Sequence, residues 1–264
     1  MISLNSSPNA LFIVKVAILW SALGTFMHLQ LPLISRSGPV ITAAIVSIIL
    51  LGVIWAFLRH ENRSFSSAGL TPTLKWPVEF AAGVALGIAV VAIMGVIILG
   101  VTAVEVNGQV TSDWLKILAT SFLVMSVLAL FEEITFRSYA VFRLRESLGI
   151  RASIYITAIV FAFYHGLVLE NLLGPGAWGL IYGWMVFKTG NIALATGFHV
   201  GLNWLQALFS QKLRYTEGVW DLQMGDASSA LNVEQVGIGL QVIVLVVGVV
   251  LVERIARQKS FQND

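Results

Sequence analysis

The sequence predicts an all-α fold, a polytopic integral membrane helical bundle with about eight transmembrane helices. Hydrophobic residues make up 57% of the 264 residues and charged residues only 11%, whereas a soluble domain carries roughly 25% charged residues. The hydrophobic residues also fall in long runs, and a helix needs roughly 20 consecutive apolar residues to cross a bilayer. Composition and pattern together exclude a soluble globular domain.

The first three apolar runs cover residues 11–29, 40–58 and 78–104. No Lys or Arg precedes the first run, so we expect an uncleaved first span rather than a signal peptide, which normally has a basic leader. Between the second and third runs, residues 59–77 form a polar connector with Gly and Pro breakers. Residues 105–112 are expected to form a short loop.

The fourth helix decides how deep the acidic residues lie in the membrane. Asp113 is a suitable N-cap, and the apolar pattern continues past Arg137 as far as Ser147, before the first Gly stop at Gly149. Such a helix is about 50 Å long at 1.5 Å per residue, which exceeds a bilayer core of about 30 Å. We therefore expect a long helix, bent if necessary, with Glu132 about 22 Å from its end.

Four further runs, residues 152–169, 177–187, 192–209 and 236–252, complete the bundle. Eight spans place both termini on one side of the membrane, and most connector Lys and Arg fall on that side. The positive-inside rule then makes both termini cytoplasmic. Lys15 and Arg143 are expected at the membrane surfaces, because long cationic side chains extend toward water.

Several classes of site are excluded by what the sequence lacks. The chain has no Cys, which excludes a disulfide framework, thiolate metal ligands and a cysteine nucleophile. It has no nucleotide-binding loop and no extended basic run, so neither a nucleotide nor a nucleic acid is expected as a partner. The expected partners are the membrane itself and a peptide or membrane-protein substrate.

Two adjacent carboxylates, Glu132 and Glu133, are the most informative feature of the sequence. Ionisable side chains at membrane depth are costly and usually mark a functional site. Neighbouring residues on a helix point about 100° apart, so the two glutamates have different surroundings. Glu133 and Arg137 form an i,i+4 pair, which favours a structural role for this pair. Glu132 is then the residue expected to carry chemistry.

Two histidines and an asparagine lie in the later apolar runs. His165 is about 20 Å into its helix and His199 about 12 Å into its own, so both can reach Glu132 near mid-bilayer. His199 and Asn203 are spaced i,i+4 and share a helix face. A single intramembrane His often only packs, and an Asn between helices usually serves as a hydrogen-bonding contact. The combination with an isolated carboxylate favours a site.

Two mechanisms fit these residues. In the first, Glu132 and His165 activate a water molecule while His199 and Asn203 stabilise the oxyanion. In the second, Glu132, His165 and His199 bind Zn²⁺ with water as the fourth ligand. Asn203 would be idle in a three-ligand zinc site, and pairing with Arg137 is expected to leave few buried carboxylates to orient the imidazoles. The sequence slightly favours the metal-free mechanism and leaves both open.

The three motifs Glu-Glu-x-x-x-Arg (Glu132 to Arg137), Phe-x-x-x-His (Phe161 to His165) and His-x-x-x-Asn (His199 to Asn203) occur in that order on separate helices. In this arrangement the chain resembles the CPBP (Abi) family of intramembrane endopeptidases, relatives of type II CAAX prenyl proteases. A Gly-rich helix and turn in residues 179–191 also resembles the family.

The resemblance covers about residues 112–209 and implies an intramembrane endopeptidase, by a metalloprotease or a glutamate-protease mechanism. It also implies a location in the bacterial cytoplasmic membrane. We accordingly divide the chain into N-terminal transmembrane helices (1–111), a catalytic CPBP-like core (112–209), and a polar loop with the last transmembrane helix (210–264).

Two other functions remain open. In a proton-coupled membrane transporter, Glu132 and His165 would relay protons, but the inverted repeats common in transporters are absent from the sequence. Some members of the family act in bacteriocin immunity or as scaffolds without catalysis. A non-catalytic protein would not need the complete set of motif residues.

Overall fold

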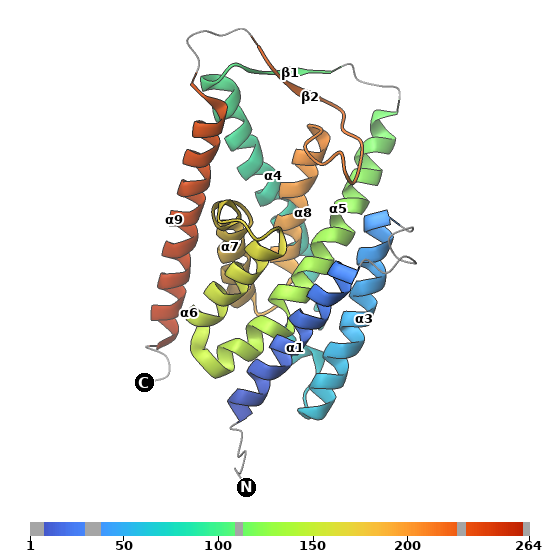
Figure 1. The fold of residues 1–264 in the computed structure, drawn as a ribbon, viewed down its shortest axis with the longest axis vertical. Coiled ribbons are helices and arrows are strands. Elements are labelled where there is room, and N and C mark those ends of the chain that lie inside the picture. The colour runs from blue at the N-terminus through green and yellow to red at the C-terminus, as the bar shows by residue number, and fades with distance from the viewer. Residues whose placement is uncertain (1–7, 30–37, 109–112, 226–230, 261–264) are drawn as a thin grey trace.

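The structure is a computed structural model that describes residues 8–29, 38–108, 113–225 and 231–260. The long helices lie side by side in one bundle, and α1 begins and α9 ends at the same end of it (Figure 1). An all-helical membrane bundle is thereby confirmed. The α-helices are α1 (Pro8–Leu29), α3 (Gly38–His60), α4 (Trp76–Val101), α5 (Trp114–Arg137), α6 (Tyr139–Tyr164), α7 (Ala177–Thr189), α8 (Ala193–Leu208) and α9 (Val233–Ser260).

The expected number of about eight spans is only approximate. Among the described residues, four stretches are long and apolar enough to cross a membrane: Gly38–His60, Trp76–Val101, Trp114–Tyr164 and Val233–Gln258. The helices α7 and α8 have 13 and 16 residues, which makes them about 20 and 24 Å long. Both fall short of a bilayer core of about 30 Å, so they lie inside the bundle rather than span on their own.

The predicted long fourth helix is wrong. The helix α5 ends at Arg137, and Ser138 has a non-helical backbone with φ −89° and ψ −112°. The following helix α6 bends again at Gly149, where φ is 84°. Glu132 therefore lies five residues from the end of α5, about 8 Å along the axis, and not 22 Å from the end of a continuous helix.

A buried polar cluster around Glu61 explains this break. Tyr139 Oη donates to Glu61 Oε1 at 2.6 Å, and Arg143 Nε lies 3.3 Å from Glu61 Oε2. Lys15 Nζ lies 3.0 Å from Glu61 Oε1. These contacts draw the first turns of α6 toward α1 and α3. No Gly or Pro near Ser138 indicates this break in the sequence. Lys15 and Arg143 are both buried, so their side chains do not extend toward water as expected, whereas their level at the membrane surface stays a prediction.

The helices α4 and α8 approach each other through glycines. A Cβ added at Gly83 would lie 2.6 Å from Phe198 N, and one at Gly87 would overlap the Phe198 carbonyl oxygen. In the opposite direction, Cβ atoms at Gly197 and Gly201 would overlap backbone carbonyls of α4. Small residues spaced four apart allow this close packing of membrane helices. The contact fixes the backbone of α8, which carries His199.

A two-stranded ribbon lies at the end of the bundle away from the start of α1 (Figure 1). Strand β1 (Val104–Asn107) pairs antiparallel with β2 (Asp221–Met224). The sequence predicts a span end, a loop and a polar stretch for these segments, so the strands were missed. The ribbon ties the loop after α8 to the end of α4.

Gly87→Ala is expected to lower the thermal unfolding midpoint in detergent, because the added methyl must push the backbone of α8 away. Overpacking of this kind costs about 1–3 kcal/mol. Gly95→Ala is the matched control on the same helix, because nothing lies within 4 Å of a Cβ there. Circular dichroism melts that are identical for the two variants would contradict the assigned contact.

Candidate active site

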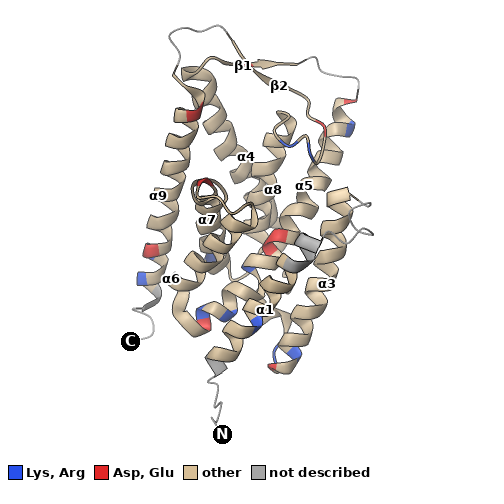
Figure 2. Ribbon diagram, viewed as in Figure 1, with Lys and Arg blue, Asp and Glu red and all other residues tan. Residues whose placement is uncertain are grey.

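The acidic pair lies in the last turns of α5. Most charged residues gather toward the two ends of the bundle, and the acidic stretch of α5 lies between them (Figure 2). Glu133 is completely buried, whereas the Glu132 side chain is 16% exposed. The two carboxylates therefore have different surroundings, as their helical geometry requires.

The Glu132 carboxylate lies between two imidazole rings. Its Oε1 is 3.9 Å from His165 Nε2, and its Oε2 is 3.5 Å from His199 Nε2. His165 caps the C-terminus of α6 and His199 is on α8. The structure thus brings together the three residues that the sequence predicted to meet.

Hydrogen bonds at the other ring nitrogen set the tautomer of each histidine. His165 Nδ1 lies 2.9 Å from Phe161 O, and a carbonyl oxygen can only accept, so Nδ1 carries the hydrogen. His199 Nδ1 lies 3.0 Å from Glu133 Oε1, and an ionised carboxylate likewise can only accept. In their neutral forms, both rings therefore present an Nε2 lone pair to Glu132.

The Glu132 carboxylate oxygens and the Nε2 atoms of the two neutral histidines are therefore all hydrogen-bond acceptors, and none of these atoms donates to another. Glu132 Oε2 is buried and has no hydrogen-bond partner in the part of the chain that the structure describes. An unsatisfied buried carboxylate oxygen is costly, so a group with positive or donor character belongs at this point. A water molecule has two donors and can satisfy the carboxylate and one imidazole together.

The Glu132 carboxylate and the two imidazole rings are also ligand types that zinc prefers, and each ring donates a hydrogen bond from its second nitrogen to an acceptor. Glu133 serves His199 in this way, so the expectation that pairing with Arg137 would use up this carboxylate is wrong. Ligand atoms around a tetrahedral zinc ion lie about 3.3 Å apart, because each metal–ligand bond is about 2.0 Å long. The distances of 3.5 and 3.9 Å are wider, and among the described residues no group of three or more potential ligands is assembled.

Arg137 is held mainly by aromatic rings. It is fully buried, and its Nη1 lies 3.7 Å from Glu133 Oε1. Its guanidinium carbon is 3.9 Å from the centroid of the Phe161 ring and 5.0 Å from that of Tyr182, which are cation–π contacts. A Cβ at Gly179 would lie 2.9 Å from Arg137 Nη2. The glycine in the Gly-rich helix therefore makes room for the guanidinium.

Among the described residues, Asn203 is not hydrogen-bonded to the other site residues. It lies on α8 one turn beyond His199 and is partly buried. It makes no hydrogen bond to Glu132, His165 or His199 among the described residues. Its predicted role at the oxyanion stays a prediction.

Tyr182 was missed by the analysis of the sequence as a site residue. Its ring stacks on His199 with centroids 4.6 Å apart and an interplanar angle of 19°. The available signal was its position between Gly179 and Gly183, where the chain lacks side chains that would keep α7 away. This stacking fixes the plane of the imidazole.

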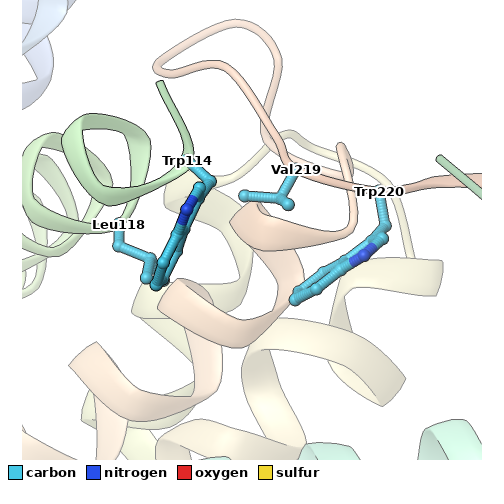
Figure 3. A pocket seen from close by; sticks show the side chains of 4 residues that line it. All are labelled: Trp114, Leu118, Val219 and Trp220. Carbon is cyan, nitrogen blue, oxygen red and sulfur yellow. The ribbon is translucent and has the colours of Figure 1, made fainter. Parts of the chain in front are cut away.

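The site opens beside His165. The His165 side chain is 32% exposed, and the apolar residues after it, Leu167 and Leu169, are 87% and 72% exposed. A separate apolar pocket of about 270 Å³ is lined by Trp114, Leu118, Val219 and Trp220 (Figure 3). Leu118 lies 14 residues before Glu132, about 21 Å along α5, so this pocket is distinct from the site.

Fold and site together define a helical membrane protein with a partly buried carboxylate that lies between two histidines. Residues 114–205 match the family described as type II CAAX prenyl endopeptidase Rce1-like. The resemblance predicted from the sequence is thereby confirmed, and it supports an intramembrane protease. No curated protein and no solved structure gives a significant match to the chain.

Arg137→Ala is expected to reduce stability, because it leaves the buried Glu133 carboxylate without its cation. Breaking a buried pair costs about 3–5 kcal/mol. Arg145→Ala, at an exposed position on α6, is the control. Unfolding midpoints and monodisperse yields in detergent measure the effect, and an Arg137→Ala protein that melts like Arg145→Ala would disprove the structural role.

Proposed function

We propose that this protein is an intramembrane endopeptidase that hydrolyses peptide bonds of membrane-associated proteins or peptides, with Glu132 as its general base. The observation that carries the proposal is the Glu132 carboxylate, which faces the Nε2 atoms of His165 and His199 at 3.9 and 3.5 Å. A carboxylate and an imidazole side by side can bind and deprotonate water.

The proposed reaction uses the side chains alone. Water donates one hydrogen bond to Glu132 and one to His165 Nε2. Its oxygen attacks the scissile carbonyl carbon as its proton moves to Glu132. When the C–N bond breaks, that proton passes to the leaving amine nitrogen, which completes the hydrolysis.

His199 has a supporting role in this proposal. Glu133 accepts from its Nδ1 at 3.0 Å, and a carboxylate in this position orients an imidazole. In this proposal His199 takes up a proton at Nε2 and donates from that atom to the developing oxyanion, assisted by the Asn203 amide when substrate draws it in. The stacked Tyr182 ring keeps the imidazole in plane.

The substrate enters from the membrane in this proposal. The exposed apolar residues Leu167 and Leu169 next to His165 suit a lipid-facing entrance. The matched family acts, by its description, on CAAX prenyl substrates. A farnesylated peptide that ends in a CAAX sequence is therefore one suitable probe, and an unprenylated peptide with a transmembrane anchor is the other.

Glu132→Gln is expected to remove cleavage while folding is retained, because the amide is isosteric but cannot accept the proton. Loss of a general base typically costs about 10²–10⁴-fold in rate. The measurement is turnover of both probes, internally quenched, by purified protein in nanodiscs. Glu170→Gln, an exposed carboxylate on the loop after His165, is the matched control.

Full activity of a well-folded Glu132→Gln protein would rule out Glu132 as the base. If well-folded wild-type protein cleaves neither probe nor other membrane peptides, the transporter or scaffold function takes precedence.

Metal dependence is tested separately. We expect active protein to contain less than stoichiometric zinc and to keep its activity after treatment with a chelator. Elemental analysis by mass spectrometry, coupled to the cleavage assay, makes the measurement. Stoichiometric zinc whose removal and return switch activity off and on would replace this mechanism with one in which Glu132, His165 and His199 are ligands.

A further inference from the structure

The β1–β2 ribbon has an open edge along β2. Gly225 N–H donates to Ala103 O at 2.7 Å, which extends the register of the ribbon by one hydrogen-bonded pair. Hydrogen-bonded and non-hydrogen-bonded pairs alternate in an antiparallel ladder, so the N–H and C=O groups of Leu222 and Met224 point away from β1. Neither residue has a backbone hydrogen bond to another segment of the described chain. An edge of this kind can pair with a further strand.

The edge of β1 is less available. Val104 is the corresponding outward-facing residue of β1, and its N–H already donates to Thr102 Oγ1 at 3.2 Å. Thr102 also forms a bridge with Leu231, which places the segment before α9 beside the start of β1. An added strand therefore fits along β2 rather than along β1.

The two faces of the ribbon differ in chemistry. Val106 and Leu222 are cross-strand partners on one face, and both are exposed. Glu105 and Asp221 lie on the opposite face, because successive side chains of a strand alternate, and neither carboxylate has an ion pair within the described ranges. A Cβ at Gly225 would lie 2.5 Å from Glu105 Oε1, so the Glu105 side chain reaches across to β2. A strand added there meets apolar side chains on one face and negative charge on the other.

The apolar face continues into the pocket at the start of β2. Trp220 directly precedes β2 and shares the face of Leu222. It lines the pocket of about 270 Å³, and Trp114 of α5 lies on the opposite side (Figure 3). A Cβ at Gly108 would lie 3.0 Å from Trp220 Cδ1, so the glycine leaves space for the indole. The pocket has room for a large apolar side chain of a strand that lies along β2.

We infer that the β2 edge and this pocket form a second binding site, the ribbon site, which binds an extended segment of the membrane-protein substrate by strand addition. The inference rests on the proposed peptidase function. In this mode of recognition, main-chain hydrogen bonds supply affinity and pockets for alternate side chains supply specificity. The bound segment carries the complementary alternation: Lys or Arg face Glu105 and Asp221, and apolar side chains, one of them large, face Leu222 and Trp220.

The distance to Glu132 determines where this segment lies in a substrate. Leu118, which lines the pocket, is about 21 Å from Glu132 along α5. This separation corresponds to about 14 residues of a helix or about 6 residues of an extended chain. The recognised segment therefore lies outside the scissile region. Its loss should weaken substrate binding without slowing the chemical step.

Binding is tested with a short fluorescent peptide of alternating Lys and Leu with one central Phe, added to protein in nanodiscs of neutral lipid. Empty nanodiscs give the background. One counterpart has Glu in place of Lys. Two others carry N-methyl groups on alternate main-chain nitrogens, one on each edge of the peptide, and only one of these edges can face β2.

For wild-type protein, we expect fluorescence anisotropy to show at least about tenfold weaker binding for only one of the two N-methylated peptides, because that peptide loses main-chain hydrogen bonds. The Glu counterpart should bind at least about fivefold more weakly than the Lys peptide, the scale of two exposed ion pairs.

Variants with matched controls test each part of the ribbon site. Asp221→Asn should reduce the preference for Lys over Glu, whereas Glu234→Gln, at an exposed position at the start of α9, should keep it. Leu118→Trp fills the pocket and should weaken binding of the Lys peptide at least about fivefold. Leu115→Trp, at an exposed position on the same helix, should bind like wild type.

A cleavage assay separates the two proposals. Fusion of the Lys peptide to the transmembrane-anchored probe should lower KM at least about fivefold with kcat unchanged, the effect of added uniform binding, and Leu118→Trp should remove this gain. If the fusion is cleaved with an unchanged KM, or if both N-methylated peptides bind like the parent, the ribbon site is wrong and the peptidase function stands.

If well-folded wild-type protein cleaves nothing, the peptidase function fails and peptide binding decides about the ribbon alone. Binding that is lost in Leu118→Trp and in one N-methylated peptide, but kept in Leu115→Trp, supports strand addition at β2. Equal binding of all peptides and variants overturns it.

Discussion

The completely buried Glu133 carboxylate is the interaction on which the rest of the site depends. It lies 3.0 Å from His199 Nδ1 and 3.7 Å from Arg137 Nη1, so it joins α8 to the last turn of α5. Arg137 in turn lies over Phe161 of α6. One carboxylate thus connects the three helices that carry Glu132, His165 and His199. Because a buried charge without its partner is strongly destabilising, the contacts of Glu133 stabilise this arrangement of the helices. Glu132 is not needed for this structural role.

Much of this arrangement can be predicted from the sequence, because apolar runs are local patterns and charged residues within them are energetically costly. The apolar runs give the bundle, and charged residues within them identify Glu132 and Glu133. What could not be predicted depends on contacts between distant segments. The break at Ser138 has no Gly or Pro and arises from contacts of Tyr139 and Arg143 with Glu61. The β1–β2 ribbon joins segments over 100 residues apart. Likewise, the contact between Glu133 and His199 could not be read from helical spacing, which pairs only residues of one helix.

Charged side chains inside this protein are satisfied in two different ways. Around Glu61, Lys15 and Tyr139 donate hydrogen bonds at 3.0 and 2.6 Å, and Arg143 Nε adds an ion pair at 3.3 Å. Around Arg137, the guanidinium nitrogens have no hydrogen-bond partner among the described residues, and the rings of Phe161 and Tyr182 take over. Aromatic faces stabilise a cation without competing for the carboxylate's lone pairs. Glu133 is thereby able to accept from His199 while it stays close to Arg137.

The glycine contact between α4 and α8 also determines which positions of α4 can be substituted. The family match begins at residue 114, after α4, although α4 supports the backbone of the helix that carries His199. The support comes from main-chain atoms that meet at Gly83, Gly87, Gly197 and Gly201, and most of α4 otherwise faces outward. Outward positions need only be apolar enough for lipid. A helix can thus be required for a site although nearly all of its side chains can be substituted by other apolar residues. Sequence comparison alone would not identify such a helix as part of the site.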